Sequence, residues 1–337
     1  MDDMSGLQPK LAVFLGAGFS MAWGLPLASE VMNPIAQAAF PGRWQRELLN
    51  RVQSAWQTAQ SKTPDISVDE FSRHIQRANG LYGLSVRDFT TFLALRLSKS
   101  HWQVGRARET KWGTGDHVRK QRDIPKPYGE LVRGLRNSEL TGVITTNYDI
   151  VVEKLLGPMP SGRLGGFRYG VDDETLIGRH AVSSQYTYGP VKVSGKVPLL
   201  KLHGSLNWEL QEDLKLVKYI DTRPSRGQRY TPLVLPPGDS EAQRLLDSTW
   251  KNAEQALRDG IIWLICGYSL PEYDEDIKKL LKDSASDGQR IVIMDPNYEL
   301  ISEKFRSILV SPRITAGPSL CESFESRHLT SAISSAV

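Results

Sequence analysis

The sequence predicts an α/β protein in which a mostly parallel sheet carries helices on both faces, with a helical insertion between two of its strands. Three observations support this fold class. Short, continuous apolar runs are typical of parallel strands buried on both faces. Helical patterns separate these runs in the last third of the chain, and a glycine-rich turn follows the first run. Strand and helix alternating in this way indicate a parallel sheet covered by helices.

The expected strands end in turn or polar residues and contain no polar face of their own. In chain order they are Leu11–Leu15, Gly142–Thr145, Leu199–Leu202, Ile261–Cys266 and Ile291–Met294. Because these runs are mostly apolar and continuous rather than alternating, we expect buried parallel strands. With a glycine-rich turn after the first of them, the predicted core is Rossmann-like.

Helical patterns come between the later strands. The segment before Gly260 has apolar residues on one helical face, and Gly260 lies where a C-terminal cap belongs. A second helix is expected over Tyr273–Asp283, directly before the last strand. The apolar face of the first helix is made by Leu246, Trp250, Ala253 and Leu257.

The segment between the first two strands differs in character and is expected to be helical. Trp44, Leu48, Val52 and Trp56 follow one another at four-residue spacing, which fits one face of a helix. Ser67, followed three residues later by a glutamate, forms a capping box that predicts the start of another helix.

We expect one domain over residues 1–337. Its Rossmann-like core covers about residues 8–26, 128–156, 197–210 and 243–310, and the helical insertion covers about 27–126. Residues 157–198 are rich in Gly, Tyr and Ser without a clear period, which predicts a loop-rich insertion with a short hairpin.

Composition excludes several classes of protein. The net charge of +4 is small for 337 residues, and much of it comes from residues 105–126, which carry seven Lys/Arg and three Asp/Glu. Such a run is usually a solvated loop; contact with nucleic acid or with another subunit is the alternative, and no base-reading motif accompanies it. The two cysteines, Cys266 and Cys321, cannot form a zinc site of four thiolates, and no metal site is expected.

The N-terminus lacks a basic region followed by an apolar run, and no stretch approaches the roughly 18 apolar residues of a membrane span. The scarcity of cysteine suits a reducing cytosol. We therefore expect a cytoplasmic protein with no membrane contact.

The turn after the first strand can bind phosphate. Gly16 and Gly18 would let backbone amides approach a pyrophosphate at the positive end of the next helix. The dehydrogenase fingerprint requires a third glycine where this chain has Met21, and the P-loop requires a Lys-Ser/Thr pair that is missing. Neither standard nucleotide motif fits.

Two further segments place polar side chains at strand ends. Asn147 and Asp149 follow the second strand, where they are either functional groups or plain caps for the next helix. His203 follows the third strand and is either a titratable catalytic group or a structural histidine. Each signal is weak by itself.

The last two strands also end in candidate ligand groups. Gly267, Tyr268 and Ser269 can present backbone and hydroxyl donors to a phosphate or a ribose. Asp295, ahead of Pro296 and Asn297, can accept hydrogen bonds from ribose hydroxyls, and an ordinary turn is the equally good alternative.

The order of these motifs along the chain resembles the sirtuin superfamily, and specifically its zinc-free bacterial branch of sirtuin-like NAD hydrolases that serve antiviral defence. The matching segments are residues 16–20, 24–26, 145–149, 202–205 and 267–271, within a scaffold from about Leu11 to Asn297. The helical insertion and the tail after about residue 310 match nothing in that family.

The resemblance implies roles for particular residues. Asn147 would contact the nicotinamide ribose and position water, His203 would be the general base on ribose hydroxyls, and Asp149 would lie near the carboxamide. The pyrophosphate would lie at residues 16–20 and the adenosine near residues 267–269, with Asp295 and Asn297 as further candidates. The whole implied NAD site comprises Gly16, Ala17, Gly18, Phe19, Ser20, Pro26, Thr145, Gly267, Tyr268, Ser269, Asp295 and Asn297.

Departures from the protein deacylases argue against the acyl-lysine reaction. The four cysteines of the deacylase zinc ribbon are missing. Thr146 stands where deacylases have a glutamine, and the segment after residues 24–26 is Leu-Ala-Ser rather than an acidic-aromatic-arginine lid.

The resemblance therefore implies hydrolysis of NAD to nicotinamide and ADP-ribose by the toxic effector of an antiphage, abortive-infection system. Implied partners are a homo-oligomer, a sensor or activator protein such as an ATPase or an Argonaute-like protein, or both; direct contact with nucleic acid stays open. The alternatives are a non-catalytic sensor of NAD or ADP-ribose and, ranked last, a deacylase or ADP-ribosyltransferase.

Overall fold

The computed structural model describes most of the predicted core and insertion. The described residues are 8–23, 25–27, 30–32, 42–78, 81–107, 126–136, 138–156, 166–169, 175–182, 185–192, 195–210, 216–218, 232–235, 244–320 and 323–336. Most of the basic stretch (residues 108–125), Gly24 and Cys321 lie outside these ranges.

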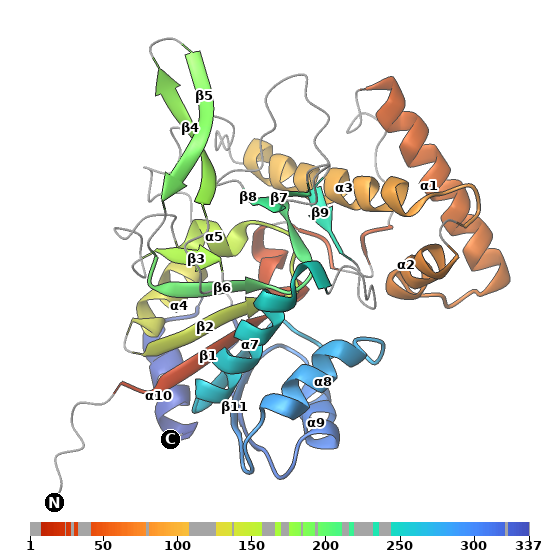
Figure 1. Cartoon of the computed structure of the whole chain (residues 1–337). Coiled ribbons are helices and arrows are strands. Elements are labelled where there is room, and N and C mark those ends of the chain that lie inside the picture. The colour runs from red at the N-terminus through yellow and green to blue at the C-terminus, as the bar shows by residue number, and fades with distance from the viewer. Residues whose placement is uncertain are drawn as a thin grey trace, which may run out of the picture.

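A seven-stranded parallel sheet forms the centre of the protein (Figure 1). Its strand order is β12-β11-β10-β1-β2-β6-β3, and every neighbouring pair is parallel. The fold class predicted from the sequence is thus confirmed. The strands are β1 (Lys10–Leu15), β2 (Glu139–Thr145), β3 (Phe167–Tyr169), β6 (Val197–Lys201), β10 (Ile262–Cys266), β11 (Arg290–Met294) and β12 (Arg313–Ala316).

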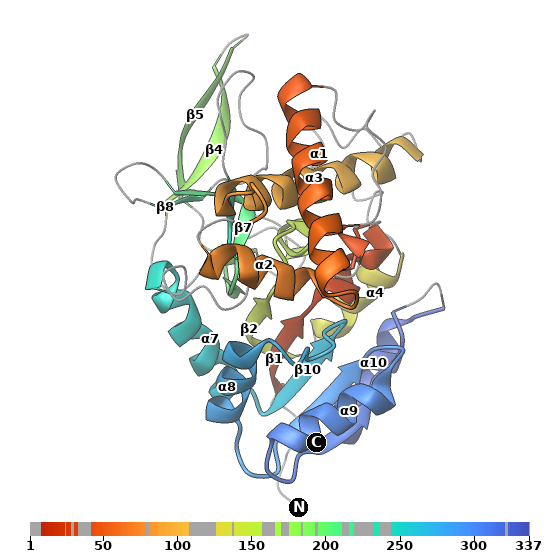
Figure 2. The same cartoon turned by 90° about the vertical axis from the view of Figure 1, so that its right-hand side faces the viewer.

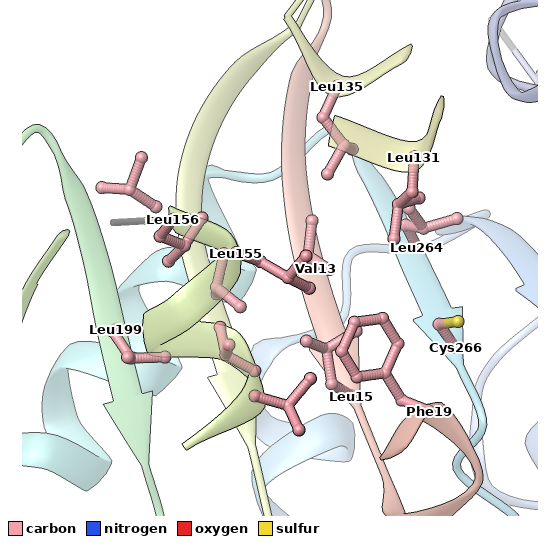
Figure 3. Close-up of a cluster of buried hydrophobic side chains, with 14 of the residues drawn as sticks. Val13, Leu15, Phe19, Leu131, Leu135, Leu155, Leu156, Leu199, Leu264 and Cys266 are labelled. Atoms are coloured by element: carbon pink, nitrogen blue, oxygen red, sulfur yellow. The ribbon is translucent and has the colours of Figure 1, made fainter. Parts of the chain in front are cut away.

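Helices cover both faces of the sheet, because alternate residues of each strand point to opposite sides. On one face, Val13 and Leu15 of β1 pack with α4 (Lys126–Leu135), α5 (Val151–Leu156) and α10 (Ser326–Ala336), as Figure 3 shows in part. On the other face, the cluster that includes Phe14 contains residues of three further helices. These are α7 (Asp247–Asp259), α8 (Glu275–Ser284) and α9 (Tyr298–Ile308).

Gly260 caps α7 as the sequence predicts, for a different physical reason. Its φ is −77°, so no left-handed conformation requires glycine here. A Cβ on Gly260 would lie 2.7 Å from the Cβ of Ala12 in β1. The glycine therefore allows the end of α7 to pack directly on the central strand.

The described part of the insertion contains three helices, α1 (Arg43–Lys62), α2 (Val68–Arg77) and α3 (Val86–Ala107), which lie together at one end of the molecule (Figure 2). They share a core of their own, to which Leu206 and Val234 also contribute. The capping prediction at Ser67 is confirmed, since its Oγ accepts the Glu70 amide at 3.1 Å. Trp44 is 56% exposed and so does not join the predicted apolar face.

The segment 157–198 holds more strand than the sequence predicts. The expected hairpin is present as β4 (Thr175–Val182) paired antiparallel with β5 (Gln185–Lys192). In addition, β3 joins the edge of the main sheet. Beyond this segment, a separate antiparallel sheet contains β7 (Gly204–Leu210), β8 (Leu216–Lys218) and β9 (Pro232–Val234).

The division into a single domain with these exact boundaries stays a prediction. Among the helices that the structure describes, none combines the length and the apolar character needed to cross a bilayer.

Candidate functional site

The candidate site lies at the carboxyl edge of the parallel sheet. Because β11, β10, β1, β2 and β6 are neighbours in that order and run in the same direction, their carboxyl ends meet along one edge. Ligands of open α/β sheets bind at this edge. The five segments singled out from the sequence therefore line up side by side, although they are distant along the chain.

The loops after β1 and β10 touch each other through their backbones. The Gly16 amide donates to Cys266 O at 3.1 Å, and the Gly18 amide donates to Gly267 O at 2.9 Å. A Cβ on Gly16 would lie 2.5 Å from Gly267 O, and Gly267 itself has a φ of +63°. These glycines thus permit a close contact between two loops. The chain then continues into the 3-10 helix η1 (Ala17–Trp23).

We expect Gly267→Ala to destabilise the fold through this contact. The new Cβ would lie 2.2 Å from the Phe19 backbone nitrogen, and overpacking of this kind costs about 1–3 kcal/mol in addition to the strain of a positive φ. Gly83→Ala is the matched control, because Gly83 has a φ of +73° and nothing within 4 Å of the new Cβ. Denaturant unfolding of both variants measures the difference, and equal losses would contradict the close contact.

Asn147 joins the loop after β2 to the loop after β1. Its Nδ2 donates to Gly16 O at 2.8 Å and to Ser20 Oγ at 3.1 Å, so both amide hydrogens are engaged. Its own backbone amide donates to Thr145 Oγ1 at 3.0 Å, and the Thr145 hydroxyl donates to Leu15 O at 3.0 Å. Asn147 is only 6% exposed, which leaves its amide group rigidly held.

Asp149 extends the same cluster. Its Oδ2 accepts a hydrogen bond of 2.7 Å from Ser20 Oγ, while its Oδ1 accepts the Val151 amide at 2.9 Å at the start of α5. Asp149 therefore caps the first backbone amide of α5, which is the helix-capping alternative given above. Ser20, Asn147 and Asp149 form one buried cluster that connects β1 and β2.

His203 lies at the end of the next strand, buried between two aromatic rings. The ring centroids of His203 and Tyr148 are 6.4 Å apart, and those of His203 and Trp250 are 6.1 Å apart. The His203 Nε2 is buried and has no hydrogen-bond partner among the described residues. Burial lowers the pKa of His203 from 6.5 to about 4, so the imidazole is neutral near pH 7. An unpartnered buried nitrogen of this kind is unusual.

The candidate residues at the far end of the edge have other partners in this structure. The Tyr268 hydroxyl donates to Asp274 Oδ2 at 2.8 Å, and Ser269 is exposed. Asp295 Oδ1 accepts the Asn297 amide at 2.8 Å, which is the turn alternative named above. Ala17 and Gly18 are half-buried, as is Pro26, and Phe19 is buried.

Sequence reasoning missed a buried ion pair beneath this site. Lys201, the last residue of β6, has its Nζ 3.0 Å from Glu153 Oε1 in α5. A lysine at the end of an otherwise apolar strand was the only sequence signal.

Among the residues that the structure describes, no group of three or more His, Cys, Asp or Glu could hold a metal ion.

No protein-family model and no curated protein matches the chain. Solved structures that resemble it include a Sir2 homologue in complex with ADP-ribose, at 14% identity and a TM-score of 0.45, covering 97% of this chain and 94% of that one. A Sir2 homologue in complex with NAD matches at 12% identity and a TM-score of 0.40, covering 98% and 90%. A structure from work on the mechanism and regulation of Sir2 enzymes matches at 14% identity and a TM-score of 0.40, covering 98% and 92%. These similarities extend over nearly the whole chain but are too low to assign a family or an activity.

Proposed function

We propose that this protein binds NAD at the carboxyl edge of its sheet and hydrolyses the bond between nicotinamide and ribose. One observation carries the proposal: the buried cluster of Ser20, Asn147 and Asp149 lies one strand from a neutral His203 whose Nε2 has no partner among the described residues. This arrangement combines a fixed neutral amide with a group able to accept a proton. The proposed site contains no zinc.

The chemistry suits such a site. When the glycosidic bond breaks, its electron pair leaves with nicotinamide, which becomes neutral, and positive charge develops on the ribose. A water oxygen then bonds to the ribose carbon, and the proton that the water gives up restores the ribose hydroxyl from which His203 has taken one. His203 later releases its proton to solvent. Asn147 holds the ribose and the water by hydrogen bonds, and neutral His203 accepts a proton from a ribose hydroxyl.

Strand order supports the orientation of the substrate. From β6 through β2 and β1 to β10 and β11, the edge presents in turn His203, Asn147, residues 16–20, residues 267–269 and Asp295. This order follows the parts of NAD from nicotinamide ribose through pyrophosphate to adenosine. Four steps of about 4.8 Å between strands give roughly 19 Å, a length suited to an extended dinucleotide.

Product analysis tests the proposal. The protein is incubated with NAD and the products are separated chromatographically; nicotinamide and ADP-ribose in equal amounts are expected. NAD that is bound but recovered intact would instead support a non-catalytic sensor of NAD or ADP-ribose. Turnover of acyl-lysine peptides, or transfer of labelled ADP-ribose to protein, would support a deacylase or an ADP-ribosyltransferase.

We further propose that the activity is that of an antiphage effector in the bacterial cytoplasm, held low until an activator or oligomerisation rearranges the site. The activator would be a sensor protein such as an ATPase or an Argonaute-like protein. The resting geometry supports gating, because both Asn147 amide hydrogens and the Gly16 and Gly18 amides already donate within the protein. Full-rate NAD cleavage by the isolated protein would contradict this gating.

A further inference from the structure

Five buried polar side chains lie directly beneath the loop that carries Asn147. They come from α5, β3, β6 and β7. Each is at most 4% exposed. We call the group the polar ring; its members are Glu153, Tyr169, Lys201, Ser205 and Asn207.

Hydrogen bonds join these side chains into a circuit that begins on a loop carbonyl, Asp149 O, and ends at Ser205, next to the Leu206 amide that binds the preceding loop carbonyl. Lys201 Nζ donates to Asp149 O and, at 3.0 Å, to Glu153 Oε1. The same carboxylate oxygen accepts from the Tyr169 hydroxyl at 2.8 Å.

The circuit then returns to the loop through β7. Asn207 Nδ2 donates to the Tyr169 hydroxyl at 2.9 Å, and Ser205 Oγ donates to Asn207 Oδ1 at 2.5 Å. Ser205 Oγ also lies 3.3 Å from Tyr148 O, which accepts the Leu206 amide at 2.8 Å as well. The Tyr148 carbonyl is therefore held by the Leu206 amide beside Ser205, and the Asp149 carbonyl is held by Lys201.

Stability alone does not account for the polar ring. Burying a lysine and a glutamate carries a desolvation penalty that their attraction often fails to recover, and apolar replacements of similar volume are frequently as stable. Here the second carboxylate oxygen, Glu153 Oε2, is buried without a hydrogen-bond partner among the described residues, which adds to the cost. What the circuit does provide is a fixed position for the backbone next to Asn147.

We propose that the polar ring is a positioning device for the proposed reaction. It fixes the backbone at residues 148–149 and thereby fixes the position of Asn147 relative to His203. In the sequence, His203 itself lies between two ring members, Lys201 and Ser205. This inference rests on the proposed function for its kinetic consequence, and on the hydrogen bonds alone for its structural one. The ring residues do not touch substrate.

Two substitutions each remove one hydroxyl group from the circuit without changing the charge. Tyr169→Phe removes the hydroxyl that joins Glu153 to Asn207 and keeps the aromatic contacts with Phe167 and Trp208, whose centroids lie 5.0 and 5.1 Å away. Ser205→Ala removes the hydrogen bond to Asn207, next to the Leu206 amide that holds Tyr148 O. Ser302→Ala is the matched control, because Ser302 is likewise 0% exposed and its Oγ donates to a backbone carbonyl, Glu299 O, in α9.

The kinetic result expected is a loss in kcat without a matching change in KM. Each single variant should lower kcat for NAD cleavage about tenfold, with KM within about twofold, because misplacement of a catalytic group slows the reaction more than it weakens binding. The double variant should lose no more than about tenfold, since the circuit is already open after one cut. Ser302→Ala should match the wild type.

Amide hydrogen exchange gives a readout that does not need activity. Exchange in residues 145–151 should rise about tenfold in both variants, while exchange in β11 should stay unchanged. If exchange of the loop is unaffected, or if kcat is unchanged in an active enzyme, the inference is wrong. A rise in KM alone, or losses that add in the double variant, would also overturn it. Absence of NAD cleavage in the wild type would instead reject the proposed function. The hydrogen-exchange measurement would then still test whether the polar ring fixes the loop at residues 145–151.

Discussion

Asn147→Ala is expected to lower the rate of NAD cleavage about 100-fold or more, because misplacing reacting groups by about 1 Å is enough for such a loss. The Asn147 side chain joins Gly16 O and Ser20 Oγ across two loops, at 2.8 and 3.1 Å. Without it, the proposed nicotinamide end of the site loses both its neutral hydrogen-bonding group and the link that fixes the loop after β1. Initial rates of nicotinamide release measure the effect.

A second substitution separates shape from hydrogen bonding. Asn147→Asp has nearly the same size, but it turns the donor that faces Gly16 O into an acceptor, so we expect a similar loss. Asn50→Ala, on the exposed side of α1, is the control and should behave as the wild type. Thermal unfolding shows whether each variant is folded. A folded Asn147→Ala protein with normal kcat/KM would remove Asn147 from the mechanism.

The centre of the fold could be predicted from the sequence because fully buried strands leave a clear pattern. In β10, all five residues, Ile262–Cys266, are buried, so the run is continuously apolar and starts within one residue of the prediction. The same holds for all but the first residue of β11 and of β1. Burial on both faces is what makes such strands visible.

The two edge strands could not be predicted from the sequence, because neither is a continuous run of buried residues. The strand β12 has no fully buried residue, and β3 contains only three residues. A strand at the edge of a sheet has one neighbour and needs no continuous apolar run. Backbone pairing with β11 and β6 defines these two strands, and pairing leaves little trace in side-chain type.

The position of the candidate residues on the sheet edge could be predicted from the sequence, but the hydrogen bonds among them could not. A polar residue after a buried strand marks a position on the carboxyl edge, which was enough for Asn147 and His203. The contact between Ser20 and Asp149 joins residues 129 positions apart, and that between Lys201 and Glu153 joins residues 48 positions apart. Only the packing of α5 on the sheet brings the second pair together.

His203→Ala is expected to lower NAD cleavage about 10²–10⁴-fold, the usual contribution of a general base. The imidazole is 5% exposed, and in the proposed mechanism its Nε2 accepts a proton from a ribose hydroxyl. His328→Ala is the matched control, because His328 is exposed in α10, away from the sheet edge that forms the site. A folded His203→Ala protein that retains wild-type turnover would show that another group takes the proton.

The pH dependence tests the same side chain by a separate route. Burial lowers the pKa of His203 to about 4, so kcat/KM of the wild type should stay level from pH 7 to about pH 5 and fall toward pH 4. Between about pH 4 and 6.5 the unfolded chain binds more protons at His203 than the folded protein does. The wild type should therefore lose stability relative to His203→Ala as the pH falls through this window. An acidic limb near pH 6.5, or parallel unfolding curves for the two proteins, would mean that this imidazole is hydrated rather than buried and neutral.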